Sequence, residues 1–110
     1  MNEKMLMTTE DAAFYLSAMP GDVTERVVRG WIAGGYLPAV KVGAHWRLDP
    51  TLVLDLMPLQ VAAETLQISV ETVREHLRTG QMKGRKLGRR WFVSRTGNAF
   101  SAVMAAEVPA

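Results

Sequence analysis

The feature that most constrains how this chain can fold is an internal repeat. Residues 28–48 align with residues 73–93 at a shift of 45, and six identities (Val, Arg, Gly, Lys, Gly and Trp) fall within the alignment. Upstream, residues 12–16 align with residues 62–66 at a shift of 50. Identities at glycine and tryptophan positions favour a duplicated structural unit over chance similarity.

The two shifts differ because the first copy has an insertion of five residues between Leu16 and Val28. Pro20 and Gly21 lie in this segment and indicate a turn. Duplicated units tolerate insertions in their connections. In a chain of 110 residues, we therefore expect two very small domains, residues 1–56 and residues 57–110.

Each copy has the pattern of two helices followed by a hairpin. In the second copy, apolar residues recur at helical spacing over 59–66 and 70–77, with Ser69 as N-cap and Gly80 as the helix end. The stretch 83–94 then predicts a hairpin turned about Gly88, with Leu87, Trp91 and Val93 on its apolar side.

The first copy predicts the same elements. These are a helix from Thr9 to about Met19, a helix from its N-cap Thr24 through Ile32, a hairpin from Leu37 to Leu48 turned at Gly43, and a third helix through Leu56 that Asp49 and Pro50 begin. Residues 96–106 are a candidate counterpart of this third helix. We expect Trp31, Trp46 and Trp91 to pack in the core, with base stacking as the alternative for Trp46 and Trp91.

Positive charge is concentrated in the second copy. The formal net charge of +2 divides into −2 for residues 1–56 and +4 for residues 57–110. Seven basic residues and no acidic one lie between Arg78 and Arg95 inclusive. A hairpin that projects this charge would bind phosphates, and a solvated basic face is the alternative.

A helix that follows a tight turn can lie in the major groove, where its exposed side chains reach base edges. The candidate DNA contacts of the two second helices are Thr24, Glu25, Arg26 and Arg29 in the first copy and Ser69, Glu71, Thr72, Arg74, Glu75 and Arg78 in the second. The candidate contacts of the hairpins are Lys41, His45 and Arg47 in the first copy and Lys83, Arg85, Lys86, Arg89 and Arg90 in the second.

The composition argues against catalysis and membrane insertion. There is no Cys, and the two histidines, His45 and His76, are 31 positions apart without metal-ligand spacing. We therefore expect no enzyme activity, no cofactor, no metal and no small-molecule ligand. Charged residues near the start break any signal-peptide core, and no apolar run approaches membrane-spanning length, so we expect a cytoplasmic protein without membrane contact.

The second copy resembles the excisionase family of winged helix-turn-helix domains, related to the DNA-binding heads of MerR-type regulators. The resemblance rests on Val73-Arg, Leu77, Gly80 and the segment 85–93. The first copy is a more divergent match through Glu10-Asp-Ala-Ala, Val28-Arg and Gly35-Tyr-Leu-Pro. The resemblance implies a mainly α fold with small β-hairpins, built as tandem winged helix-turn-helix domains.

The function expected from this resemblance is sequence-specific binding of double-stranded DNA, as a transcriptional regulator of a phage, plasmid or integrative element. The first alternative is an excisionase, or recombination directionality factor, that bends attachment-site DNA. The second is a protein-interaction module such as an antirepressor. The partners expected besides DNA are an integrase, another regulator or a second copy of the chain.

Overall fold

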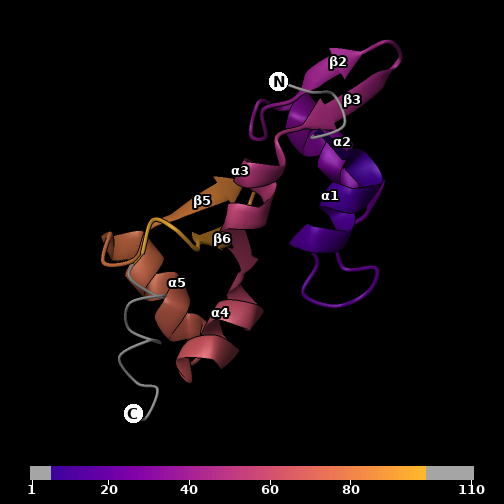
Figure 1. Ribbon diagram of the computed structural model, residues 1–110. Coiled ribbons are helices and arrows are strands. Elements are labelled where there is room, and N and C mark those ends of the chain that lie inside the picture. The colour runs from indigo at the N-terminus through magenta and orange to yellow at the C-terminus, as the bar shows by residue number, and fades with distance from the viewer. Residues whose placement is uncertain (1–5, 99–110) are drawn as a thin grey trace, which may run out of the picture.

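A computed structural model describes residues 6–98 of the chain (Figure 1). The N-terminal half contains β1 (Met7–Thr8), α1 (Thr9–Leu16), α2 (Glu25–Ala33), β2 (Val40–Val42), β3 (His45–Leu48) and α3 (Pro50–Asp55). The C-terminal half contains β4 (Leu56–Pro58), α4 (Leu59–Leu66), α5 (Val70–Thr79), β5 (Gly84–Leu87) and β6 (Arg90–Ser94).

The expectation of a mainly α fold is wrong. The described residues are 44% helix and 23% strand, and the strands form two three-stranded antiparallel sheets. The strand orders are β1-β3-β2 and β4-β6-β5, so each predicted hairpin gains a third strand from the segment that precedes its first helix. These added strands have only two and three residues, too few to show an alternating pattern in the sequence.

The sequence signals for helix boundaries agree closely with the structure. The side chains of Thr24, Asp49 and Ser69 each accept a hydrogen bond from a backbone N–H of the helix that follows. Gly80 ends α5 with φ of +83°, in the left-handed region that favours glycine. These residues satisfy backbone groups that a helix end would otherwise leave unpaired.

Helix α1 ends at Leu16, before the predicted end at Met19. The hydroxyl of Ser17 donates to the carbonyl of Ala13 at 2.6 Å and accepts the backbone N–H of Val23 at 2.9 Å. Ser17 thereby joins the end of α1 to Val23, two residues before α2 begins. The insertion lies in the loop between these two helices, residues 17–24, which we call the α1–α2 loop.

The C-terminal hairpin, β5–β6, lies between the two halves. Successive side chains of a strand point to opposite faces, so the residues of this hairpin alternate between contacts with one half and contacts with the other. Trp91 and Val93 pack with the helices of their own half, whereas Leu87 and Phe92 are fully buried in the core of the N-terminal half. The predicted apolar side is therefore wrong for Leu87, which lies on the face opposite to Trp91.

One face of this hairpin packs on the N-terminal half. We call it the docked face, and it comprises Arg85, Leu87, Arg90, Phe92 and Ser94. The ring of Phe92 meets that of Trp31 edge to face at 5.8 Å between centroids. Across the same junction, the hydroxyl of Ser94 donates to Asp55 at 2.7 Å. The expected domain boundary at residues 56 and 57 falls inside β4.

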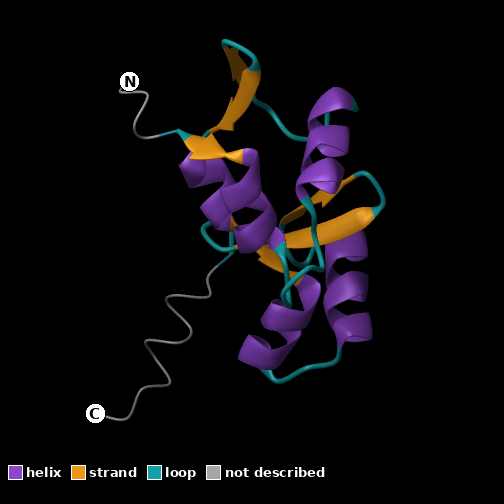
Figure 2. Cartoon of the chain, turned by 90° about the vertical axis from the view of Figure 1, so that its right-hand side faces the viewer, coloured by secondary structure: helices purple, strands orange, loops and turns teal. Residues whose placement is uncertain are grey.

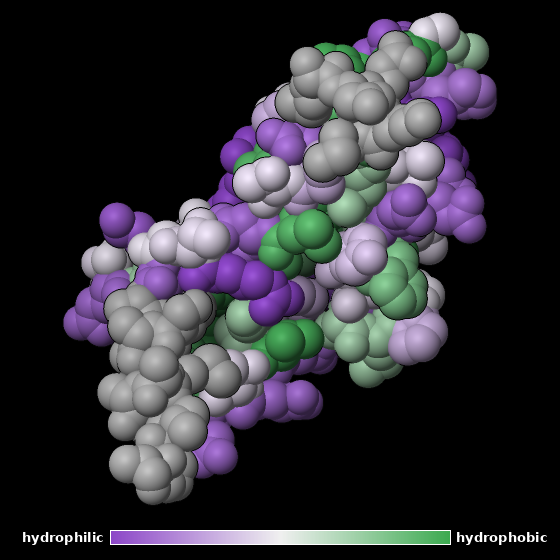
Figure 3. Space-filling view, viewed as in Figure 1, coloured by the Kyte–Doolittle hydropathy of each residue, from purple (hydrophilic) through white to green (hydrophobic). Residues whose placement is uncertain are grey.

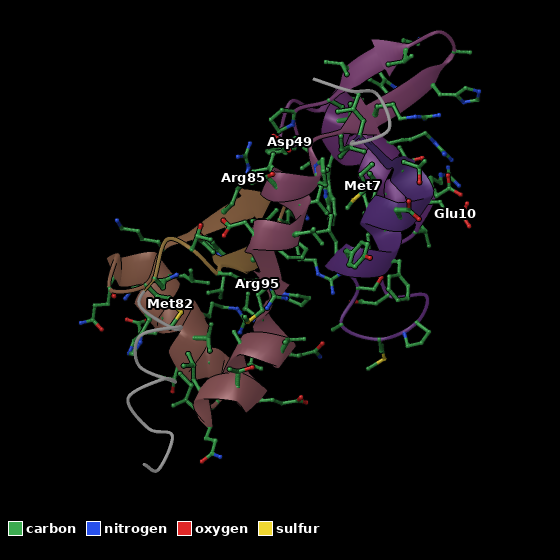
Figure 4. All side chains as sticks on the ribbon, viewed as in Figure 1. Met7, Glu10, Asp49, Met82, Arg85 and Arg95 are labelled. Carbon is green, nitrogen blue, oxygen red and sulfur yellow. The ribbon has the colours of Figure 1, made fainter. Side chains whose placement is uncertain are left out.

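Two arginines extend the junction beside α3, where Figure 4 shows both of them labelled. The guanidinium of Arg85 donates to the carbonyl of Tyr36 at 3.0 Å, and that of Arg95 donates to the carbonyl of Leu54 at 3.1 Å. Hydrophobic side chains gather near the middle of the face that Figure 3 shows, with hydrophilic ones on both halves around them. Hydrogen bonds from Arg85 and Arg95 therefore add to the apolar contacts that Leu87 and Phe92 make at the junction.

The N-terminal hairpin, β2–β3, projects from one end of the molecule, whereas β5–β6 lies in the middle (Figure 2). Among the described residues, no helix has the length and hydrophobicity needed to cross a membrane. Thr96, Gly97 and Asn98 form bends rather than a helix, and the rest of the predicted helix over residues 96–106 lies outside the described residues.

Candidate nucleic-acid interface

Helix α5 presents charged side chains to solvent, as the periodicity predicts. Arg74 and Glu71 form an ion pair of 3.7 Å with side chains 53% and 81% exposed. Arg78 is hydrogen-bonded through two nitrogens to Glu75, and these bonds lower the pKa of the Glu75 carboxyl. Such surface pairs contribute little to stability, so both arginines can change partners at small cost.

Two of the six predicted contacts on α5 serve the helix itself. The hydroxyl of Ser69 accepts the backbone N–H of Thr72 at 3.1 Å, and the two hydroxyls lie 2.9 Å apart. Both residues lie at the N-terminal end of α5, which carries positive partial charge. That end is a favourable place for a phosphate.

Helix α2 places its predicted contacts differently. Glu25 accepts a hydrogen bond from the hydroxyl of Thr9 at 3.0 Å and one from Arg29 at 3.3 Å, while Thr24 caps the helix. Arg26 is exposed. The C-terminal end of α2 lies against the C-terminal hairpin through Trp31, which is 9% exposed and belongs to the core as expected.

The cations of the C-terminal hairpin fall into two groups. Lys83, Lys86 and Arg89 are exposed, and the Lys86 ammonium lies 5.7 Å from the ring centroid of the half-buried Trp91. Arg85 and Arg90 instead bind the N-terminal half, through Tyr36 and Asp22. The hairpin therefore presents only part of its charge to solvent, in contrast to the projecting arm that the sequence predicts.

The N-terminal hairpin repeats this geometry. Lys41 lies 5.5 Å from the ring centroid of Trp46, as Lys86 does from that of Trp91. His45 is exposed, and Arg47 donates to the carbonyl of Trp46 at 2.9 Å. Arg47 occupies the repeat position of Phe92, so the face that is docked in one hairpin carries a cation in the other.

A cleft of about 590 Å³ brings the predicted contacts of α5 and of the hairpin turn together. Its lining includes Arg74 from α5, Arg89 from the hairpin turn, Arg90 from the start of β6, and Gln60 from α4. Met19, Asp22 and Trp31 complete the lining from the N-terminal half. Arginines that line one cleft can bind an anion with several oxygen acceptors, such as a phosphate.

Asp22 neutralises part of the positive charge of this cleft, and it is not among the site residues that the sequence predicts. Its Oδ2 accepts the backbone N–H of Ala18 at 3.0 Å and the guanidinium of Arg90 at 2.5 Å. The Ala18 N–H, with further help from Arg90, outweighs the opposing effect of burial and lowers the pKa of the Asp22 carboxyl. The signal that could have identified Asp22 was the insertion, because an acidic residue there has no counterpart in the second copy.

Among residues 6–98, no group of three or more His, Cys, Asp or Glu side chains could hold a metal ion. Comparison of the chain with protein-family models, curated proteins and solved structures found no match.

Proposed function

We propose that this protein binds double-stranded DNA, with its principal contacts in the C-terminal half. The observation that carries the proposal is the convergence of Arg74 on α5 with Arg89 and Arg90 of the C-terminal hairpin at one cleft. A helix after a tight turn, flanked by a basic hairpin, can contact base edges and backbone phosphates together. The resemblance to excisionase-like domains supports the same reading.

The biological role that we propose is regulation of transcription by occupation of an operator. Excision of a mobile element is the related alternative, because it would use the same side chains on DNA that is bent. Footprinting of the surrounding genomic DNA at two salt concentrations separates them. A regulator protects one operator near a promoter, whereas a directionality factor protects several adjacent sites and bends the DNA.

The two halves would contact DNA unequally. The contacts across the docked face fix one half against the other, so sites for both would be held at a constant spacing, roughly 10 bp or one helical turn. The N-terminal hairpin has Ala44 and His45 where the C-terminal one has Arg89 and Arg90. It therefore brings less charge to the backbone.

Arg74 provides the mutational test of base readout. A bidentate arginine contact to guanine is worth about 1 to 3 kcal/mol of discrimination. We expect Arg74→Ala to weaken binding by that amount at the footprinted site, as measured by fluorescence anisotropy. On a duplex of scrambled sequence the loss should be much smaller. Equal losses on both duplexes would contradict a role of Arg74 in base recognition.

Binding of a protein partner is the second candidate function, and one observation favours it. Phe14, Tyr15 and Met19 are 74%, 48% and 61% exposed on α1 and the loop that follows it. Exposed apolar side chains that lie together often mark a binding surface. This candidate predicts no measurable binding of duplex DNA at physiological salt, so the footprinting experiment decides between the two.

A further inference from the structure

We propose that Arg89 and Arg90, which line this cleft beside Arg74, form a phosphate site that the chain itself occupies with Asp22. When the protein binds DNA, a backbone phosphate takes the place of the Asp22 carboxylate on Arg90. This inference rests on the proposed function. It adds a residue of the N-terminal half that sets the affinity of the C-terminal half for DNA.

The first step of the argument concerns charge. The cleft is lined by three arginines and by one acidic residue, Asp22. Within the described residues, Arg89 has no ion pair, and the Arg74 ion pair with Glu71 is long and exposed. The cleft therefore keeps a positive excess while Asp22 is bound. Positive charge lining a cleft attracts anions, because the field is focused there.

The second step concerns the position of Asp22. Its carboxylate is held by the backbone N–H of Ala18, within the loop that the insertion creates. The side chain of Asp22 is 22% exposed and that of Arg90 is 36% exposed, so water and ligands reach the pair. Opening the pair leaves Asp22 bonded to Ala18. The exchange therefore strands no buried charge.

The third step is the match between the two acceptors. A carboxylate and a phosphodiester each offer two oxygens to an arginine, and a phosphate is the group that a forked guanidinium binds well. Asp22 thus resembles the ligand that it competes with. DNA must displace this internal competitor from Arg90. The competition weakens binding to every sequence equally, because phosphates carry no sequence information.

Asp22→Asn is the direct test, because asparagine keeps the shape and the bond to Ala18 but loses the charge. We expect this variant to bind a duplex about three- to tenfold more tightly than the wild type. The matched control is Asp11→Asn, which removes the same charge from the exposed surface of α1. Fluorescence anisotropy with one duplex at fixed salt measures all variants, and circular dichroism verifies that they are folded.

A double-mutant cycle attributes the gain to the pair. Arg90→Ala should weaken binding more in the Asp22→Asn background than in the wild type, because wild-type Arg90 must first leave Asp22. Additive effects of the two substitutions would overturn the proposal. So would equal affinities of the Asp22→Asn and Asp11→Asn variants.

The same variants distinguish this inference from the proposed function. If the wild type binds DNA and Asp22→Asn brings no gain, the phosphate exchange is wrong and DNA binding stands. If no variant binds DNA, the proposed function fails. Titration with inorganic pyrophosphate, followed by the melting temperature, then tests the cleft alone. Saturable stabilisation of Asp22→Asn beyond that of Asp11→Asn would show a site for a free phosphate, and its absence would overturn the site.

Discussion

Single residues at the junction determine how the two halves are held together. Asp55, at the end of α3, accepts hydrogen bonds from the hydroxyl of Ser94 and from both the backbone N–H and the hydroxyl of Thr96, each at 2.7 Å. Burial opposes ionisation of Asp55, but these bonds outweigh it and lower the pKa of its carboxyl. One carboxylate therefore fastens the end of the C-terminal sheet to the N-terminal half.

Asp55→Asn tests this contact. Hydrogen bonds to a partly exposed charged group suggest a loss of about 1 to 2 kcal/mol in the free energy of unfolding at pH 7. Urea unfolding measures the loss, and Glu64→Gln on the exposed side of α4 is the control. A loss no larger than that of the control would contradict the role of Asp55.

The pH dependence follows from the direction of the shift. The pKa of Asp55 is lower in the folded state, so the unfolded chain binds more protons in acid. The stabilisation is therefore present above the unfolded pKa of about 3.9 and is lost as the pH falls through the folded pKa. The difference in stability between wild type and Asp55→Asn should shrink from pH 7 to pH 3.

At the scale of elements, the two hairpins are copies with different surroundings. Their turns contain glycines at equivalent positions, Gly43 and Gly88, each with φ of +63°. A Cβ on Gly88 would lie 3.1 Å from Nε1 of Trp31, whereas a Cβ on Gly43 would have no atom of the described residues within 4 Å. The turn of β5–β6 is thus packed against α2, whereas among residues 6–98 nothing packs against Gly43 in the turn of β2–β3.

This pair of glycines gives a matched comparison. Alanine at either position has the same unfavourable φ, at a cost of about 1 to 2 kcal/mol. Gly88→Ala should destabilise the protein more than Gly43→Ala, because only the former also displaces Trp31. Thermal unfolding of both variants measures the difference. Equal melting temperatures would argue against close packing of the hairpin turn on α2.

At the scale of the whole molecule, the repeat explains each half and not their association. Caps, helix spans and hairpin turns could be predicted, because each depends on neighbouring residues in the sequence. The packing of one half on the other depends on positions where the copies differ. Trp31 of the first copy aligns with His76 of the second, and Phe92 of the second copy aligns with Arg47 of the first. The similarity that revealed the repeat therefore hid the junction.

One signal of the junction was present in the sequence. Trp91, Phe92 and Val93 are three consecutive apolar residues on one strand, so both faces of that strand must be covered. A single helical pair covers only one face. The N-terminal half covers the other face. It also brings Asp22 to Arg90 and completes the lining of the cleft at which the candidate DNA contacts meet.

The most direct test of the central claim is the salt dependence of duplex binding. If four to six cations each neutralise a phosphate, the logarithm of the binding constant falls against that of salt with a slope of about −4 to −5. Combined Arg89→Ala and Arg90→Ala should make this slope shallower by about 1 to 2, because two phosphate contacts are lost. Lys41→Ala with Arg47→Ala removes equal charge from the other hairpin and should change the slope less. An unchanged slope in the Arg89 and Arg90 variant, or no binding by the wild type, would contradict the claim that this cleft grips DNA.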